Sequence, residues 1–361
     1  MAEDDNLARL RNGRAWHDFC DRLKHAGDEI MAASPDDDFD RAEGLRYLSR
    51  LTHHFLRSTI DESDPAMALL ASSSPKIGLD NPDYIYTGGR LSPSYEYCLR
   101  IELNDAHMLG IGAFSGALGT SDGLVRDAYL TTDELELDAD RCIEIAISRT
   151  HRDGNWLAMG AETNYLNIRQ TLLRRREQTP ARFELERVDG GEPPAALEPR
   201  SLVAALDRVG LTVGGVIDQF IEWTDSFRSR PFEIHPIDPK FLAVAQGDPN
   251  TTYHYSYWEL EEGEVFEIIL EPPAAFDYWN LQIGNHWLES LDYLHRNTHV
   301  NHETAVVEDD GSVRILVAAR DPGHPNWLDT AGHRRGALAL RWVGASESPP
   351  QPRTRVRGLD D

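Results

Sequence analysis

Two stretches of this chain resemble each other: SRTHRDGNWLAMG at residues 148–160 and ARDPGHPNWLDTAG at residues 319–332. Each places an arginine six residues before the tripeptide Asn-Trp-Leu, and each is followed by a strand-like segment that carries an arginine, Arg169 or Arg341. Self-similarity of this kind indicates an internal duplication. We therefore expect two β-rich units in which Asn-Trp-Leu forms an architectural corner, with its tryptophan largely buried in both copies.

The sequence on either side of these stretches has the composition typical of short β-strands. Residues 78–190 and 231–343 are rich in β-branched and aromatic residues, punctuated by Gly, Asp and Asn. Between them, apolar residues recur at helical spacing from 198 to 229, and we expect the glycine pair at 214–215 to break this helix in two. The prediction is a mainly β fold with α: two β-sandwich or jelly-roll units at 78–190 and 231–343, separated by a helical insertion at 191–230.

The two ends of the chain differ from this β-rich part. Residues 1–77 show apolar positions at helical spacing, and SPDDDFD supplies an acidic first turn that suits a helix N-terminus. We therefore expect a helical N-terminal layer. Residues 344–361 contain three prolines and no apolar periodicity, which predicts a disordered tail.

The composition argues against several classes of function. The chain has 36 Lys+Arg against 61 Asp+Glu, a net charge of −25, whereas nucleic acids and anionic lipids require a cationic face. It has no apolar run long enough to span a membrane, and its start, MAEDDNLARLRNG, lacks the features of a secretory signal. Its three cysteines form no CxxC motif, so we expect reduced thiols. We predict an acidic, soluble, cytoplasmic protein without nucleic-acid or membrane partners, and leave formation of a homo-oligomer open.

The segment 277–305 concentrates the polar residues that could carry chemistry. Its histidines and interleaved acids include His286, His295, His299, His302, Glu289 and Asp292. On a strand, His299 and His302 would point to opposite faces, so a metal site would need a histidine from a neighbouring strand. We predict no metal and, because no phosphate-binding loop, nucleophile elbow or HExxH motif occurs, no cofactor.

We predict a ligand pocket in this part of the second unit, in which a histidine works beside a carboxylate. His286 or His302 would act as general base or acid, because the pKa of imidazole lies near neutrality, and Glu289 or Asp292 would orient the ring. Antiparallel pairing of the YWNLQIGNHW and HVNHETA strands would bring the histidines together. The pocket would be lined by Tyr278, Trp279, Trp287 and Asn301. The alternative is that these histidines face solvent or satisfy loop carbonyls.

Two further segments supply candidate residues. Arg320 and Asp321 precede a Pro-Gly turn, and Arg320 or Arg341 could clamp an anionic group or steady developing negative charge. Asp321 could serve as the carboxylate partner of His286 or His302, or it could instead cap the turn. In DNPDYIY at residues 80–86, Tyr86 could stack on a ligand, although a rigid turn leading into a strand is the more ordinary use of such a segment.

The chain resembles a known family in its C-terminal part. YWNLQIGNHWLESLDY, HVNHETA and DDGSVRILVAARDPGHPNWLDTAGHRRGALALRW, within residues 278–343, resemble the pattern of bacterial proteins assigned to domain of unknown function 1214. GLDNPDYIYTGG, at residues 78–89, resembles a motif near the start of the β-rich part of those proteins. The resemblance implies β-sandwich or jelly-roll architecture with a helical N-terminal portion, and it carries no established reaction.

Three functions remain open at this stage. The first is a cofactor-free enzyme of hydrolase, lyase or isomerase type, which would act on a bulky, partly apolar small molecule by histidine and carboxylate chemistry. The second is a non-catalytic protein that binds a small molecule or glycan in the same aromatic-lined concavity. The third is a metal-dependent enzyme that uses the histidines between His286 and His302.

Overall fold

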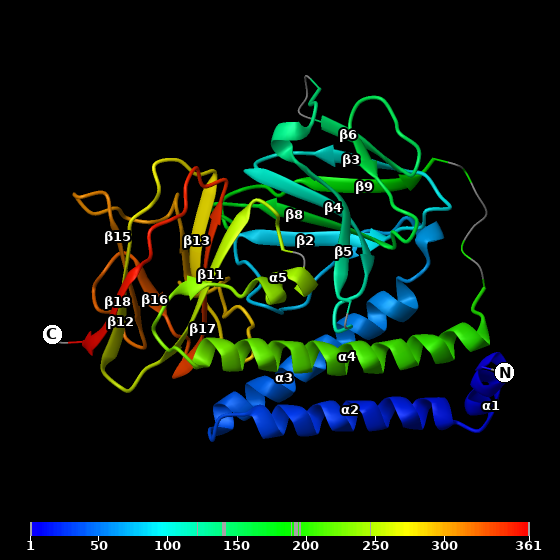
Figure 1. The fold of residues 1–361 in the computed structure, drawn as a ribbon, viewed down its shortest axis with the longest axis horizontal. Coiled ribbons are helices and arrows are strands. Elements are labelled where there is room, and N and C mark those ends of the chain that lie inside the picture. The colour runs from blue at the N-terminus through cyan, green and yellow to red at the C-terminus, as the bar shows by residue number, and fades with distance from the viewer. Residues whose placement is uncertain are drawn as a thin grey trace.

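The computed structural model describes residues 2–120, 122–138, 142–188, 190, 194, 196–245 and 247–359. Two β-rich units stand side by side, and helices α1 to α4 run along one edge of the molecule (Figure 1). Three helices precede the first unit and α4 links it to the second: α1 (Ala2–Arg11), α2 (Arg14–Ala33), α3 (Asp38–Leu56) and α4 (Pro199–Arg228). The predicted mainly β fold with a helical N-terminal segment is confirmed.

The helical layer has a defined start and a shared apolar stripe. The side chain of Asp37 accepts hydrogen bonds from the backbone N–H groups of Phe39 and Asp40, which caps α3 at its N-terminus. Apolar side chains of α2, α3 and α4 lie in one buried cluster that also includes residues of the second unit. The helices are therefore fixed to the β-rich part by burial of their apolar faces.

The first unit is a sandwich of two sheets around a core made mainly of Leu, Ile and Ala side chains. One sheet has five described strands, in the order β1 (Ala71–Ser72), β2 (Tyr84–Arg90), β8 (Tyr165–Thr171), β4 (Met108–Gly116) and β5 (Leu124–Thr131). The other has four, in the order β7 (Trp156–Ala158), β6 (Cys142–Ser148), β3 (Tyr97–Glu102) and β9 (Arg182–Arg187).

The second unit repeats this arrangement. Its five-stranded sheet has the order β10 (His235–Pro236), β11 (Thr251–Glu259), β17 (Arg335–Val343), β13 (Tyr278–Ile283) and β14 (His299–Asn301). Its four-stranded sheet has the order β16 (Trp327–Asp329), β15 (Val313–Ala318), β12 (Glu264–Leu270) and β18 (Arg353–Gly358). Each described strand of the first unit thus has its counterpart nine strands later, at the same place in the corresponding sheet. The duplication predicted from Asn-Trp-Leu is therefore present in the topology.

The asparagines of the two Asn-Trp-Leu stretches hold equivalent corners. The Nδ2 group of Asn155 donates to two backbone carbonyls, and its Oδ1 accepts a backbone N–H at 2.8 Å. Asn326 makes the same three hydrogen bonds, and again its Oδ1 accepts a backbone N–H at 2.8 Å. The backbone partners are Glu136 and Glu144 in the first unit, and Val306 and Arg314 in the second. These residues are architectural in both copies.

The tryptophans of the same two stretches also make equivalent hydrogen bonds in the two units. The indole Nε1 of Trp156 donates to the carbonyl of Ser148 at 3.3 Å, and that of Trp327 donates to the carbonyl of Ala318 at 2.9 Å. Both rings are half-buried rather than largely buried, because β7 and β16 lie at the edges of their sheets. The expectation of matching places is confirmed, and the expectation of deep burial is wrong.

β17 is buried on both of its faces, and this brings Arg341 inside the protein. Leu338, Leu340 and Trp342 point into the sandwich core of the second unit. Side chains alternate along a strand, so Ala337, Ala339 and Arg341 lie on the opposite face, which packs toward the helices. Arg341 is consequently a buried arginine rather than a solvent-facing one.

Two details of the predicted organisation are wrong. Helix α4 is continuous through the glycine pair. Gly215 does not end the helix, and its lack of a side chain allows α4 to lie against the backbone of Gly119. The expected disordered tail contains strand β18, which pairs with β12. Arg355 and Arg357 of this strand form ion pairs with the buried carboxylate of Glu267 at 2.8 and 2.9 Å, so charge rather than apolar periodicity fixes it.

The remaining described helical segments are short: the π-helical turn Arg57–Asp61, the 3-10 turns Pro65–Met67 and Thr132–Glu134, and α5 (Pro239–Ala245). Across the described ranges, we find no helix that combines the length and the apolar character needed to cross a bilayer.

Candidate functional site

A cavity of about 540 Å³ lies where the two units meet the helical layer. Its walls come from β2 and β8 of the first unit, β11 and β17 of the second, the C-terminal end of α3 and the middle of α4. In Figure 1, β2, β8 and β11 lie next to one another above α4. Each of the two duplicated five-stranded sheets therefore contributes one face to the same cavity.

The charged side chains around this cavity have the opposite balance to the whole chain. Among the described residues, four arginines and two carboxylates line it: Arg90, Arg169, Arg208, Arg341, Glu62 and Asp80. Both carboxylates already have partners within the chain. Glu62 forms an ion pair with Arg57 at 3.1 Å, and Asp80 accepts hydrogen bonds from the N–H and Oγ–H groups of Ser290 at 2.9 and 2.8 Å. The cavity is thus cationic in a chain whose net charge is −25.

Arg341 is the most deeply buried of these arginines, with 5% of its surface exposed. Its Nη1 donates to the Oε1 of Gln282 at 2.6 Å and its Nη2 donates to the carbonyl of Leu79. Its guanidinium group also lies over the ring of Tyr253, 6.0 Å from the ring centroid. All these partners are neutral, and no carboxylate in the described part of the chain forms an ion pair with Arg341.

Arg169 occupies the equivalent position in the first unit. Tyr86 lies opposite Arg169 in the pairing of β2 with β8, and Tyr253 lies opposite Arg341 in the pairing of β11 with β17. Arg169 differs in having an acid nearby: it interacts electrostatically with Asp248, whose carboxylate accepts a hydrogen bond from Tyr129 at 2.6 Å. The duplication therefore supplies two arginine–tyrosine pairs to one cavity, of which one has a neighbouring carboxylate.

The tyrosine hydroxyl groups of the cavity are neutral at physiological pH. Burial raises the pKa of Tyr86 to about 12 and the pKa of Tyr255 to about 12. The hydroxyl oxygen of Tyr86 accepts the backbone N–H of Asn81 at 3.0 Å, which leaves its own proton available for a ligand. Tyrosines here can donate hydrogen bonds, but they are poor general bases.

The rest of the cavity wall combines Ser, Thr and Asn residues with a set of apolar side chains. Helix α4 contributes Phe220 and Trp223, and α3 contributes Phe55. Ile77, Leu118 and Leu242 complete this apolar set. An apolar cavity with a few converging polar groups is the usual form of a small-molecule site.

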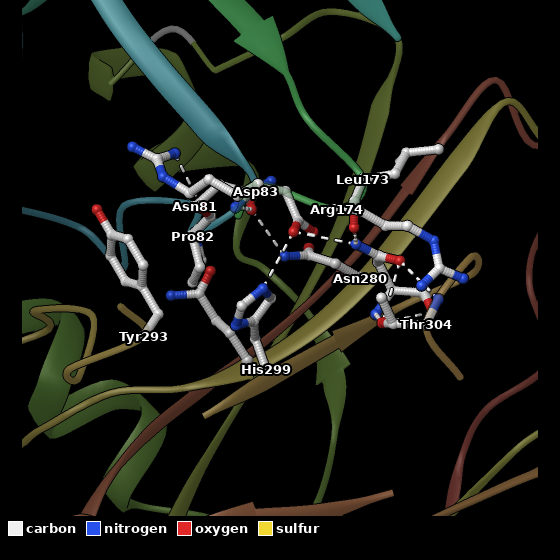
Figure 2. Close-up of polar contacts among 12 residues, drawn as sticks. Asn81, Pro82, Asp83, Leu173, Arg174, Asn280, Tyr293, His299 and Thr304 are labelled. Atoms are coloured by element: carbon white, nitrogen blue, oxygen red, sulfur yellow. Dashed lines mark hydrogen bonds and ion pairs between the residues drawn. The ribbon is translucent and has the colours of Figure 1, made fainter. Parts of the chain in front are cut away.

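A separate polar network fixes the turn that leads into β2. The carboxylate of Asp83, which is 1% exposed, accepts hydrogen bonds from the Tyr278 hydroxyl at 2.7 Å, the Asn301 Nδ2 at 3.0 Å and the His299 Nε2 at 3.1 Å. Asn280 donates to Asn81 at 2.8 Å in the same network, which Figure 2 shows between the turn and strands β13 and β14. The DNPDYIY turn is therefore structural, as its ordinary use implies. It joins the two units and positions Tyr86 toward the cavity.

The predicted residues near His286 form contacts between the second unit and the helical layer. The Nδ1 atom of His286 accepts a hydrogen bond from the Tyr257 hydroxyl at 2.8 Å, and its Nε2 lies 3.3 Å from the carbonyl of Ala33. Burial lowers the pKa of His286 to about 4, so the ring is neutral. Trp287 donates to the carbonyl of Asp40 at 2.8 Å. The adjacent cavity, of about 10 Å³, has room for no more than one water molecule.

Glu289 also contacts the helical layer. Its carboxylate forms an ion pair with Arg50 of α3 at 2.5 Å and accepts a hydrogen bond from Asn285 at 2.9 Å. Burial raises the pKa of Glu289. It does not contact His286 through any hydrogen bond found in the described residues.

His286 and His302 lie at opposite ends of β13. The predicted antiparallel pairing of β13 with β14 is confirmed, but Gln282 lies opposite His299 and the N–H of His302 donates to the carbonyl of Trp279. This register carries His302 away from His286. His302 packs instead against Tyr278, with ring centroids 5.8 Å apart, beside the Asp83 network. Trp279 belongs to the sandwich core and lines neither cavity.

The other predicted residues lie on the surface. Asp292 is exposed and bonds to His295 at 2.9 Å, which lowers the pKa of the carboxyl group. Arg320 and Asp321 are exposed, and the Oδ1 of Asp321 accepts the N–H of Gly323 at 2.7 Å, as expected for a turn cap. No cluster of three or more His, Cys, Asp or Glu side chains in the described ranges is arranged to hold a metal ion.

Of the residues predicted to bind a ligand, Tyr86 lines the large cavity, as does Arg341, the predicted anion clamp. Tyr253 and Tyr255 also line the cavity and were not predicted to do so. Their signal is present in TTYHYSYWE, the sequence of β11, where tyrosines alternate and so share one face.

The comparisons with known proteins agree with this fold. Residues 259–347 match the model of the family described as "Protein of unknown function (DUF1214)". A crystal structure of an uncharacterised protein from Burkholderia cenocepacia is 39% identical over 98% of this chain and 99% of that chain, with a TM-score of 0.93. The VPA0106 protein from Vibrio parahaemolyticus shares the fold at 11% identity, over 92% of this chain and 100% of that chain, with a TM-score of 0.50. A search of the curated proteins finds no match. The C-terminal part of the chain, residues 259–347, therefore matches the DUF1214 family of unknown function, and the chain as a whole belongs to one family with the Burkholderia cenocepacia protein.

Proposed function

We propose that this protein binds a small molecule with an anionic group and a partly apolar body, and that the ligand occupies the cavity between the two units. The observation that carries the proposal is the state of Arg341. It lines the cavity, it is 5% exposed, and its partners in the described chain are neutral. A buried cation without a counter-charge is costly, and an anionic ligand would supply that charge.

The surroundings of Arg341 support the same class of ligand. Neutral tyrosine hydroxyls stand beside the guanidinium group, where they can add hydrogen bonds to a carboxylate or phosphate. Phe220 and Trp223 offer apolar surface for the body of the ligand. Recognition inside a cavity also accommodates the acidic exterior, because the cationic groups lie within the protein rather than on a broad face.

Binding is favoured over catalysis by the placement of His286 and His302, the two predicted catalytic histidines. Acid–base chemistry by His286 or His302 stays a prediction, and neither residue lines the large cavity. A cytoplasmic setting is part of the proposal, with the three cysteines, all free of disulfides, as its support. Homo-oligomer formation is not part of it.

The test compares anions with neutral molecules of the same shape. We expect 2-naphthoate, indole-3-acetate or decanoate to raise the melting temperature of the full chain, and the corresponding amides to have no comparable effect. Arg341→Gln should remove the response, whereas Arg149→Gln, which changes an exposed arginine outside the cavity, should keep it. Equal responses to acids and amides, an unchanged response in Arg341→Gln, or no response to any acid would contradict the proposal.

A further inference from the structure

The cavity has a second cationic end, formed by Arg90 and Arg208. Arg90 lies at the end of β2, on the same face as Tyr86, and its guanidinium group lies 5.7 Å from the centroid of the Tyr165 ring. Its Nη2 donates to the carbonyl of Ser58 at 3.3 Å. Arg208 reaches the cavity from α4 and is exposed to solvent. In the described chain, neither arginine forms an ion pair with a carboxylate.

The positive charges of Arg90 and Arg208 repel each other. Burial first, and then the like charge of Arg208, lowers the pKa of Arg90. Nearby His54 adds no further positive charge, because burial and the neighbouring arginines lower its pKa to about 4. Glu62 also lines the cavity, but it is paired with Arg57. Two neighbouring cations without an acid of their own are an unusual feature for this acidic chain, and an anion between them would relieve their repulsion.

The register of β2 and β8 sets the separation of Arg90 from Tyr86, on which the charges of Arg341 and Arg169 both act. Tyr86 pairs with Arg169 at one end, and Arg90 pairs with Tyr165 at the other. Arg90 follows Tyr86 by four positions of extended strand, which corresponds to about 13 Å. Between them, the cavity face of these strands carries only Gly88 and Asn167, both uncharged.

We propose that the ligand carries an anionic group at each end of an apolar linker, with one group held by Arg341 and the other by Arg90 and Arg208. This inference rests on the proposed function, because it assumes that the cavity binds an anion at Arg341. It narrows the ligand class to α,ω-dicarboxylates and molecules of the same charge pattern. The linker would lie along Gly88 and Asn167, against the apolar side chains of α4.

The test measures the affinities of a diacid and its matched monoacid by calorimetry with the full chain. Sebacate and decanoate have the same carbon number, and adipate, suberate and dodecanedioate vary the length. We expect sebacate to bind about tenfold more tightly than decanoate, since one charge-assisted contact is worth about that much. Among the diacids, affinity should pass through a maximum with length.

Three variants separate the two ends. Arg208→Gln changes an exposed side chain that does not support the core. It should weaken the binding of sebacate several-fold and leave the binding of decanoate unchanged. Arg90→Gln should do the same more strongly, by about tenfold. Arg341→Gln should weaken the binding of both acids, and Arg149→Gln should affect the binding of neither. Circular dichroism and the melting temperature check the folding of each variant.

The outcomes distinguish this inference from the proposed function. If decanoate binds and depends on Arg341, but sebacate gains no affinity and ignores both Arg90→Gln and Arg208→Gln, the two-ended ligand is wrong and the anion site stands. If no acid binds, or if Arg341→Gln folds and binds both acids as the parent does, the proposed function itself is wrong.

Discussion

Arg169 and Arg341 are equivalent residues of the two duplicated units, and both line one cavity. Duplication of a unit ordinarily yields two separate copies of a feature, one in each half. Here the two five-stranded sheets turn equivalent faces toward a common space, so the copies of the arginine–tyrosine pair become parts of a single site. The two halves are not identical, because Asp248 accompanies Arg169 while the partners of Arg341 are neutral.

The close contact between α4 and the first unit predicts opposite effects at adjacent glycines. A Cβ atom at Gly215 would lie 2.0 Å from the carbonyl oxygen of Gly119, whereas one at Gly214 would meet nothing within 4 Å. Gly215→Ala should therefore lower the free energy of unfolding by about 1–3 kcal/mol through overpacking. Gly214→Ala should raise it by about 0.5–1 kcal/mol through helix propensity. Urea unfolding measures both, and equal effects would show that the contact is absent.

The Asp83 network predicts a large effect from a change of one atom. Asp83→Asn replaces an acceptor oxygen by an NH₂ group that faces the donors of Tyr278, Asn301 and His299. We expect the free energy of unfolding to fall by about 3 kcal/mol, because buried donors lose their partner. Asp321→Asn is the matched control, since its exposed turn bond can be made by an amide oxygen. Comparable losses in the two variants would argue against the network.

The equivalence of the two corners predicts parallel effects. Asn326→Ala removes three hydrogen bonds at a residue that is 1% exposed, and should cost about 2–3 kcal/mol. Asn155→Ala removes the same three bonds at a half-buried residue and should cost less, but still above 1 kcal/mol, an estimate of about one net bond or more. Thermal and urea unfolding check both. A neutral effect at Asn155 would mean that only the second corner is needed.

Buried histidines predict a loss of stability in acid. His254 is 6% exposed, and burial lowers its pKa to about 4 from the ordinary 6.5. Between these values the unfolded chain binds the proton and the folded chain does not, so stability is lost as the pH falls from 6.5 toward 4. The contribution has an upper bound of about 1.4 kcal/mol per pH unit.

The test compares slopes rather than absolute stabilities. His254→Gln should make the dependence of the unfolding free energy on pH shallower in this window than in the parent. His54 and His286, whose pKa values are also lowered to about 4, contribute equally to both proteins and cancel. His17→Gln, which changes an exposed ring, should leave the slope unaltered. The same slope in all three proteins would show that His254 titrates normally in the folded state.

Local patterns predicted the fold more fully than the site. The Asn-Trp-Leu stretches, the alternating strands and the helical N-terminal segment were sufficient to predict two β-rich units and their duplication. The tail was misjudged because β18 is held by ion pairs with Glu267, which leave no apolar periodicity to detect. The glycine pair was misjudged because a glycine can end a helix or permit close packing, and the choice depends on a loop distant in sequence.

The site depends on register and on which face each strand buries. The pairing of β13 with β14 followed from their short connection, but the register that separates His286 from His302 did not. Arg341 was a predicted candidate for an anion clamp and Tyr86 for a ligand contact, and both line the cavity. Their meeting with Tyr253 and Arg169 requires the two sheets to face one space, which no local pattern encodes.

The contrast between the cationic cavity and the −25 charge of the chain has a kinetic consequence. An approaching anion first meets the repulsive field of the whole protein, which extends over a Debye length of about 10 Å at 0.1 M ionic strength. Only inside does it meet the arginines, where the surrounding protein shields their attraction from salt. Added salt should therefore speed the association of an anionic ligand, the reverse of ordinary electrostatic steering, and the acidic exterior acts as an entry filter that disfavours highly charged competitors.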